Sequence, residues 1–255
     1  MNATRGTLFV EDAEVVSHET HAGDQHVLRL LSPQTAARAQ PGNFIHIQCD
    51  PAILMRRPMS IMRVERRQGQ IDILYKIHGL GTELLAKKRP GDVLNLVGPI
   101  GVPFKLSGYR PRPLLIGGGV GIPPMIFLSE HMKSPGARVK PLILMGSEVP
   151  FPFRPRPSQF LVPGIPAEVI AAMPLMEDWG FPSRLASMKS LPGCFEGNIT
   201  LVREYQLPCQ VSLEEYMACA VGGCAGCNVR INTANGPAMK RVCVDGPVFD
   251  AAAVP

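Results

Sequence analysis

Hydrophobic residues in the first hundred positions fall into short runs, and polar turn residues separate these runs. Each run is rich in Val, Ile and Leu and is bounded by Gly, Pro, Asp or Asn, which is the pattern of β-strands. The expected strands are Thr7–Val10, Gln25–Leu31, Asn43–Gln48, Ser60–Glu65, Gln70–Ile77 and Val93–Val97. One helix is expected over Glu83–Lys88, with Thr82 as its N-cap and Pro90–Gly91 beyond its end. Short strands at this density predict a small antiparallel barrel or sandwich.

A different pattern begins after residue 106. Leu114–Ile116 is an apolar strand that leads through a glycine turn into an apolar segment of helical length. Val139–Glu148 contains a second apolar strand, and Ala167–Met173 is the candidate for a third. Strands that alternate with helices predict βαβ units and a parallel sheet.

A third pattern occupies residues 211–255. Ser212–Ala218 is expected to be a short helix in which Ser212 and Glu215 form a capping box. Val229–Val244 is expected to be a hairpin that turns at Asn235–Gly236. The three patterns together predict a multidomain α+β chain, with an antiparallel β-barrel over 1–106, a shortened α/β domain over 107–210 and a small C-terminal module over 211–255.

The C-terminal module contains the sequence CAVGGCAGC. Cys219, Cys224 and Cys227 have C-x4-C-x2-C spacing and Cys243 follows them, which is the spacing of plant-type [2Fe–2S] ligands. The intervening glycines let the backbone wrap a cluster and direct N–H groups at its sulfurs. Zinc is the alternative metal, although its sites favour C-x2-C pairs, and inert buried thiols are the second alternative. A module of this size seldom folds without a metal, a disulfide or a partner.

Composition narrows the class of protein. Hydrophobic residues make up 45% of the chain and charged residues 18%, as in a globular protein. The net charge is +5, but the basic residues are scattered, so no nucleic-acid partner is expected. No signal peptide and no membrane span are expected either, because no sufficiently long apolar run occurs. A cytoplasmic location is therefore expected, and there a cysteine cluster favours metal binding over disulfides.

Residues 57–82 form a first candidate nucleotide site. Arg57 and Ser60 have R-x-x-S spacing, and Gly79, Gly81 and Thr82 lie where a helix begins. Free backbone N–H groups at such a position favour an anion, and Arg57 could bind a diphosphate with two hydrogen bonds. An exposed arginine and an ordinary helix cap explain the same residues equally well.

The glycine turn after Leu114–Ile116 is a second candidate nucleotide site. It contains Gly117, Gly118, Gly119 and Gly121. The turn resembles a dinucleotide-binding turn in which Pro124 stands where the third glycine is usual. A tight connection between a strand and a helix is the alternative. Glu148, after the second strand, could accept a hydrogen bond from a ribose 2′-hydroxyl and favour NAD over NADP.

The order of these motifs resembles the ferredoxin–NADP reductase superfamily. Within it, the chain is similar to the family of electron-transfer subunits of dihydroorotate dehydrogenase. The segments that carry the resemblance are RRPMSI, LGTELL, GGGVGIPPM, QVSLEEYMACAVGGCAGC and RVCVDGPVF.

The resemblance implies an FAD-binding barrel, an NAD-binding α/β domain and a C-terminal [2Fe–2S] domain. It implies that FAD is bound by Arg57, Pro58, Met59, Ser60, Leu74, Tyr75, Lys76, Gly81 and Thr82. It implies that the cluster is bound by Cys219, Cys224, Cys227 and Cys243. In this family, FAD exchanges a hydride with NAD and single electrons with the cluster. The cluster connects to a catalytic, FMN-containing subunit that oxidises dihydroorotate in pyrimidine biosynthesis, and a heterotetramer is expected.

The α/β domain departs from the family pattern. Family members usually have, before the cluster domain, a further strand that ends in a Cys-Gly motif and lines the nicotinamide pocket. Here about 40 residues separate the third expected strand from the cluster domain, without a Cys-Gly, so an internal segment is expected to be missing. Two other functions therefore stay open: a stand-alone NAD(P)H-dependent reductase for a ferredoxin, sulfide or oxygenase partner, and a degenerate relay subunit that does not bind NAD.

Overall fold

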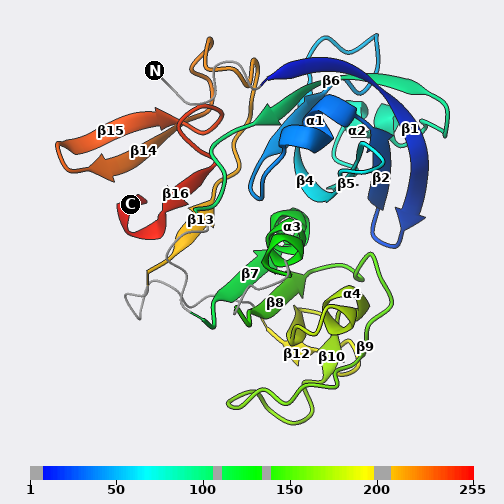
Figure 1. The fold of residues 1–255 in the computed structure, drawn as a ribbon, viewed down its shortest axis with the longest axis vertical. Coiled ribbons are helices and arrows are strands. Elements are labelled where there is room, and N and C mark those ends of the chain that lie inside the picture. Colours follow the sequence, from blue (N-terminus) through cyan, green and yellow to red (C-terminus); the bar gives the residue numbers. More distant parts are fainter. Residues whose placement is uncertain (1–7, 106–110, 134–138, 198–207) are drawn as a thin grey trace.

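The computed structural model describes residues 8–105, 111–133, 139–197 and 208–255, and Figure 1 shows their arrangement. The N-terminal part is a closed antiparallel barrel with the strand order β1-β2-β5-β4-β3-β6. Its strands are β1 (Phe9–His21), β2 (Gln25–Leu31), β3 (Phe44–Ile47), β4 (Arg57–Glu65), β5 (Gln70–Lys76) and β6 (Val93–Ile100). Helices α1 (Pro33–Arg38) and α2 (Leu80–Leu85) lie in its connections. The predicted barrel is confirmed.

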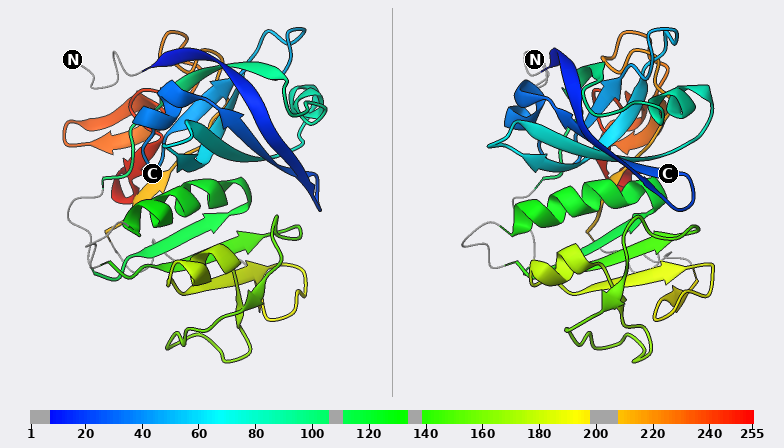
Figure 2. Two further views of the ribbon diagram at one scale, coloured as in Figure 1. Left: turned by 45° about the vertical axis from the view of Figure 1, so that its right-hand side comes forward. Right: turned by 90° about the vertical axis from the view of Figure 1, so that its right-hand side faces the viewer.

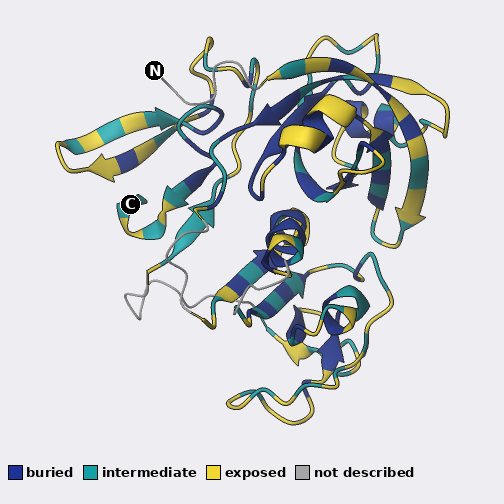
Figure 3. Ribbon diagram, viewed as in Figure 1, coloured by how far each residue is buried: buried dark blue, intermediate teal, exposed yellow. Residues whose placement is uncertain are grey.

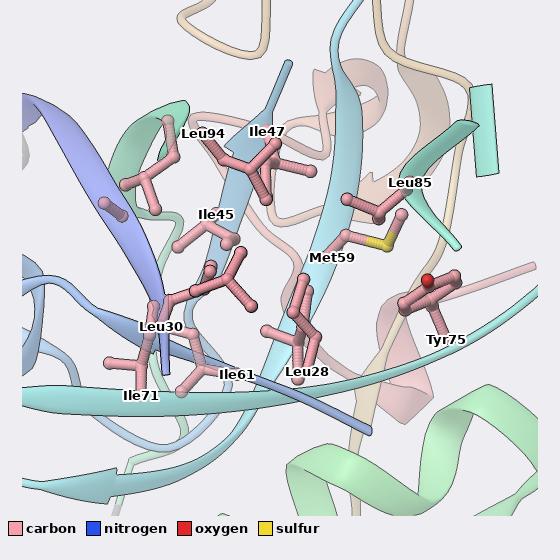
Figure 4. Close-up of a cluster of buried hydrophobic side chains, with 14 of the residues drawn as sticks. Leu28, Leu30, Ile45, Ile47, Met59, Ile61, Ile71, Tyr75, Leu85 and Leu94 are labelled. Atoms are coloured by element: carbon pink, nitrogen blue, oxygen red, sulfur yellow. The ribbon is translucent and has the colours of Figure 1, made fainter. Parts of the chain in front are cut away.

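The barrel interior is filled by aliphatic side chains from every strand. Leu28, Ile45, Ile61, Ile71 and Leu96 are fully buried, and Figure 4 shows several members of this cluster pointing toward one another. Successive residues of a strand face opposite sides of the sheet. The alternation of apolar and polar residues in the sequence therefore decides which side chains enter the core.

Several details of the barrel differ from the prediction; for example, one helix was expected and α1 was missed. Strand β1 extends to His21, because it pairs with β2 from Glu14↔Leu31 to His21↔Gln25. Helix α2 begins at Leu80 after Gly79, so Thr82 is inside the helix and is not its N-cap. The Thr82 hydroxyl instead accepts from the His78 N–H at 2.7 Å and donates to the Gly79 carbonyl at 3.0 Å.

The middle of the chain contains a parallel sheet with the order β12-β11-β8-β7. Its strands are β7 (Leu114–Gly118), β8 (Leu142–Ser147), β11 (Ser183–Ser187) and β12 (Phe195–Glu196). A one-turn η1 (Gly119–Gly121) leads into α3 (Ile122–Met132), and α4 (Pro174–Asp178) precedes β11. In both views of Figure 2, α3 lies between the barrel and this sheet.

The third strand of the parallel sheet was predicted wrongly. Within Ala167–Met173 only β10 (Ala171–Ala172) is a strand, and it pairs antiparallel with β9 (Arg156–Pro157) outside the parallel sheet. The third parallel strand is β11, which pairs with β8 from Ser183↔Ile143 to Ser187↔Ser147. Its sequence SRLAS is short and half polar, yet all five residues are buried. Tertiary burial therefore overrides a weak local β signal.

The C-terminal part contains two small antiparallel pairs. Strand β13 (Gln210–Ser212) pairs with β16 (Val248–Asp250), which continues into η2 (Ala251–Ala253). Strand β14 (Asn228–Thr233) pairs with β15 (Gly236–Arg241). The predicted helix over Ser212–Ala218 is wrong, because Ser212 ends β13 and the next five residues form no regular element. The hairpin is confirmed, but Thr233 pairs with Gly236, so its turn is Ala234–Asn235.

The C-terminal part packs directly on the barrel. Phe44 of β3 and Ile100 of β6 share an apolar cluster with Ala220, Cys227 and Cys243. Among the described residues, no helix has the length and apolar character that crossing a membrane requires.

Candidate functional site

The four cysteines of the C-terminal motif lie close together. The backbone N–H of Cys224 donates to Sγ of Cys219 at 3.3 Å, Cys227 and Cys243 share one buried apolar cluster, and both Cys227 and Cys219 influence the pKa of Cys243. The hydrogen bonding between β14 and β15 continues as far as Cys227 and Cys243, because the N–H of Val242 donates to the Cys227 carbonyl at 2.9 Å. In the part of the chain that is described, no group of three or more His, Cys, Asp or Glu residues is placed to hold a single metal ion.

The loop directs backbone N–H groups at its sulfurs. Gly226 donates to Sγ of Cys224 at 3.4 Å. Burial by itself raises the pKa of Cys219, but backbone hydrogen bonds, from Cys224 first and then from Val221 and Gly223, outweigh it and lower the pKa to about 7. Such donors stabilise thiolates, which are the form that binds iron.

Cys227 and Cys243 lie deeper than the other two cysteines of the motif. Both are buried, whereas Cys219 is partly exposed and Cys224 is exposed. Burial, followed by the neighbouring Cys227 thiol, raises the pKa of Cys243 to about 12. A metal that replaces the thiol protons would remove this penalty, because bound thiolates share their charge with the cation. The donor set of four sulfurs therefore fits an iron–sulfur group chemically.

On the barrel, the structure brings Arg57 and Gly81 together. A Cβ at Gly81 would lie 3.2 Å from both Nε and Nη2 of Arg57, a tight contact that would press on the guanidinium. The Arg57 Nη1 donates to the Met55 carbonyl at 2.8 Å. Arg57 and Gly81 come from different elements, β4 and the start of α2. A guanidinium beside the N-terminus of a helix is suited to a phosphate.

The other β4 candidates divide by the side that they face. Pro58 and Ser60 are partly exposed, while Met59 belongs to the barrel core. Met59 therefore contributes its backbone to the candidate site, while its side chain packs in the barrel core beneath that site.

Tyr75 is held by two histidines that the sequence did not single out. His18 Nδ1 donates to the Lys88 carbonyl at 2.7 Å, so the Nε2 of neutral His18 accepts from the Tyr75 hydroxyl at 2.9 Å. His26 stacks on the Tyr75 ring with centroids 5.2 Å apart. Burial, and then the neighbouring His18, lowers the pKa of His26. Tyr75 is thereby fixed at the end of the barrel core (Figure 4).

A pocket of about 500 Å³ lies between the barrel and the parallel sheet. Its barrel side includes Leu74, Tyr75 and Lys76, and its sheet side includes Gly118, Gly119 and Glu148. Two segments that the sequence singled out separately thus share one cavity. Of the predicted glycines, Gly117 is not a lining residue: a Cβ there would lie 2.7 Å from the Gly121 carbonyl oxygen, so it permits the tight turn.

The pocket also contains residues that sequence reasoning missed. They are Gln25, Ile116, Val120, Gly146, Ser147, Val149, Ser187, Met188 and Gly197. Several follow the carboxyl ends of β8 and β11, where ligands of parallel sheets bind. Ser187 and Met188 were missed because the third parallel strand was expected within Ala167–Met173. Gln25 is placed by tertiary contacts, because its side-chain amide donates to the carbonyls of Ala22 at 2.9 Å and Pro150 at 2.6 Å.

The fold and these sites define a class of flavin- and iron–sulfur-binding oxidoreductases. Residues 7–104 match the family model of the oxidoreductase FAD-binding domain, and residues 214–255 match that of the iron–sulfur cluster binding domain of dihydroorotate dehydrogenase B. A solved NADH-dependent reduced ferredoxin–NADP oxidoreductase has the same fold, with a TM-score of 0.73 and 21% identity over 96% of this chain and 90% of that one. The cytochrome b5 reductase domain of Ulva prolifera nitrate reductase has a TM-score of 0.53 and 16% identity, over 72% and 76%.

Curated relatives identify the family within that class. The dihydroorotate dehydrogenase B (NAD(+)) electron transfer subunit of Desulforamulus reducens is 33% identical, over 94% of this chain and 96% of the relative. The corresponding subunit of Geobacillus thermodenitrificans is 32% identical, over 96% and 98%. This chain belongs to the family of dihydroorotate dehydrogenase B electron transfer subunits.

Proposed function

We propose that this chain passes electrons between NAD and a catalytic dihydroorotate dehydrogenase subunit in pyrimidine biosynthesis. The observation that carries the proposal is that both candidate cofactor sites lie on one barrel. The pocket opens on β5, and the cysteine module packs on β3 and β6. FAD, when bound, supplies the exchange between hydride and single-electron chemistry. The chain's own part is to hold the flavin between a nicotinamide pocket and a cluster.

The proposed FAD site extends along β4, β5 and the start of α2. It comprises Arg57, Pro58, Met59, Ser60, Leu74, Tyr75, Lys76, Gly81 and Thr82. Arg57 beside Gly81 supports the diphosphate end of this assignment. Leu74, Tyr75 and Lys76 line the pocket, which supports the isoalloxazine end, while the Tyr75 ring is anchored in the barrel core by His18 and His26. Thr82 contributes by stabilising the turn before α2, because its hydroxyl is hydrogen-bonded to the backbone of His78 and Gly79.

The proposed NAD site is the glycine turn of the parallel sheet. Gly118 and Gly119 line the pocket directly, Gly117 permits the tight turn, and Gly121 is the N-cap of α3, with open space where a Cβ would lie. Glu148 lies in the pocket after β8, and an acidic residue at the end of a second strand favours a free ribose 2′-hydroxyl. This supports NAD over NADP.

The proposed cluster ligands are Cys219, Cys224, Cys227 and Cys243. Their C-x4-C-x2-C spacing with a distant fourth cysteine would suit a [2Fe–2S] cluster, and among the described residues no group is placed to hold a single metal ion such as zinc. Cys227 and Cys243 pack against Phe44 and Ile100 of the barrel, whereas Cys219 is partly exposed and Cys224 is exposed.

The organisation of the whole subunit is part of the same proposal. We assign FAD binding to residues 1–106, NAD binding to 107–210 and cluster binding to 211–255. A heterotetramer with the FMN-containing catalytic subunit would place the cluster between the two flavins. Thiolate ligands persist in a reducing compartment, which supports a cytoplasmic location.

A second candidate function is a relay subunit that does not react with NAD. The observation that favours it is the position of β7, which is the edge strand of the parallel sheet in the described residues. The strand expected from the family, with its Cys-Gly motif, would add to such an edge. Its loss would remove part of the nicotinamide pocket and leave the FAD and cluster sites intact.

Anaerobic titration of the reconstituted protein with NADH separates these functions. We expect the flavin and [2Fe–2S] absorbance bands to bleach together as NADH is added. Bands that only dithionite bleaches would support the relay function and contradict the NAD site. A reconstituted protein with neither band would contradict the whole proposal.

A further inference from the structure

We propose that the β14–β15 hairpin is a docking arm that binds an acidic surface of the catalytic subunit. The inference rests on the proposed electron-transfer function, because it assumes that such a subunit receives or supplies electrons at the cluster.

The hairpin projects from the rest of the molecule. In Figure 1 and in the left view of Figure 2 it extends away from both the barrel and the parallel sheet. Its strands form a sheet of their own, so among the described residues neither edge has a further partner strand. A two-stranded hairpin in isolation is marginally stable, and unpaired edges invite pairing with another chain.

The two faces of the hairpin differ. Ile231 is buried and Val229 is partly buried on the face toward the module. Arg230 pairs across the strands with Met239, and both are exposed on the opposite face. Met239 is 61% exposed, and Figure 3 shows the hairpin as mostly exposed and partly exposed surface. Arginine and methionine are enriched where proteins bind one another.

The charge of the hairpin indicates the chemistry of its partner. Residues 228–241 contain Arg230, Lys240 and Arg241 and no Asp or Glu. Arg241 is engaged within the module, because its Nη1 donates to the Gly222 carbonyl at 2.9 Å. Arg230 stays on the outer face beside Met239. Lys240 pairs with Val229 on the other face, so Arg230 is the cation that the outer face presents. A guanidinium beside an exposed apolar side chain matches an acidic group that adjoins an apolar contact.

The hairpin is also continuous with the proposed cluster ligands. Strand β14 begins directly after Cys227, and β15 ends two residues before Cys243. The hydrogen bond from Val242 N–H to the Cys227 carbonyl joins the two strands at this point. A partner that binds the hairpin is therefore held beside the cluster, where single electrons must pass from one subunit to the other.

The test measures binding of the cofactor-loaded chain to the catalytic dihydroorotate dehydrogenase subunit of the same organism by biolayer interferometry at several salt concentrations. Arg230→Glu and Met239→Asp are compared with matched controls elsewhere. Arg67→Glu changes an exposed charge on the β4–β5 turn, and Leu161→Asp changes a side chain that is 98% exposed between β9 and β10. Cluster absorbance and NADH-driven dye reduction are measured on each preparation.

We expect Arg230→Glu and Met239→Asp each to weaken binding about tenfold or more. Arg230→Glu should also reduce the salt dependence of binding. The control variants should bind as the unchanged chain does, and dye reduction should be the same in all five proteins. Equal binding by hairpin and control variants, or equal weakening of both, would overturn the docking assignment alone. An unchanged chain that does not bind the catalytic subunit at all would overturn the proposed function.

Discussion

The carboxylate of Glu11 joins the first strand of the barrel to the start of α1. It accepts from Ser32 Oγ at 2.6 Å, from the backbone N–H groups of Gln34 and Thr35 at 2.8 Å, and from the Thr35 hydroxyl at 2.5 Å. Burial by itself raises the pKa of Glu11, but these hydrogen bonds outweigh it and lower the pKa below its ordinary value of 4.5. One residue thus satisfies the free donors at a helix N-terminus.

Replacing this carboxylate should change how stability depends on pH. Because the pKa of Glu11 is lower in the folded state, ionisation stabilises the fold at neutral pH, and this contribution is lost as pH falls through the folded pKa, below 4.5. Glu11→Gln should lower the free energy of unfolding by about 1–3 kcal/mol at pH 7. The loss should be smaller in acid. Urea unfolding at pH 7 and in acid measures this.

Glu14→Gln is the matched control, since Glu14 is exposed on the same strand. It should unfold as the unchanged chain does at both pH values. An equal effect of the two substitutions would contradict the role assigned to Glu11.

At the scale of elements, the cysteine loop depends on backbone conformations that few residues adopt. Ala220, Gly222 and Ala225 have positive φ values of 55°, 83° and 53°. At Gly222 a side chain is also excluded, because a Cβ would lie 2.5 Å from Cγ2 of Val244. Gly223 is different: its nearest neighbour would be Sγ of Cys219 at 4.0 Å. Adjacent glycines therefore have unequal roles in this loop.

Gly222→Ala should impair the loop, whereas Gly223→Ala should be tolerated. The first substitution combines a left-handed backbone with a steric clash, which together cost about 1–3 kcal/mol. We expect a lower iron and sulfide content and an earlier thermal loss of cluster absorbance for Gly222→Ala, with FAD retained. Full iron content and an unchanged melt in Gly222→Ala would show that the loop adopts another conformation around its cofactor.

At the scale of the whole molecule, one cluster of side chains joins the barrel to the parallel sheet. Arg63 of β4 donates to Glu130 of α3 through Nε at 3.0 Å and Nη2 at 2.7 Å. The same guanidinium lies 5.6 Å from the ring centroid of Trp179, and Lys133 Nζ lies 5.4 Å from it. Both cations are attracted to the ring face. These contacts set how the two walls of the pocket face each other.

Trp179 is the single tryptophan of the chain, so its fluorescence reports on this junction. Arg63→Met should shift its emission to longer wavelength. It should also raise the KM for NADH about threefold or more, because a hydride must pass between groups held by separate walls. FAD and iron contents should stay unchanged.

Arg29→Met is the control for this prediction. It removes a comparable ion pair within the barrel, in which Arg29 Nε donates to the Asp72 carboxylate at 2.7 Å. It should lower stability without moving the Trp179 emission. An unchanged emission and KM in Arg63→Met would mean that other contacts fix the two walls.

Local patterns were enough to predict the barrel strands, the glycine turn before α3 and the cysteine spacing. They failed where burial outweighs local preference. The fully buried β11 has too few apolar residues to be found from its sequence, and Ser212–Ala218 has a capping box but joins β13 to the cysteine loop instead of forming a helix. The contacts of His18 and His26 with Tyr75 had no sequence signal, because they come from strands that meet only in the closed barrel.

Which chemical groups this protein carries can be read from local patterns, since the period of apolar positions and the spacing of cysteines and glycines are relations between near neighbours. Which of these groups meet depends on the folded chain. Folding places Arg57 against Gly81, brings Cys243 beside Cys227, and joins Leu74–Lys76 to the glycine turn in one pocket. These relations depend on strand pairing and packing between segments far apart in the chain, and no local pattern encodes them.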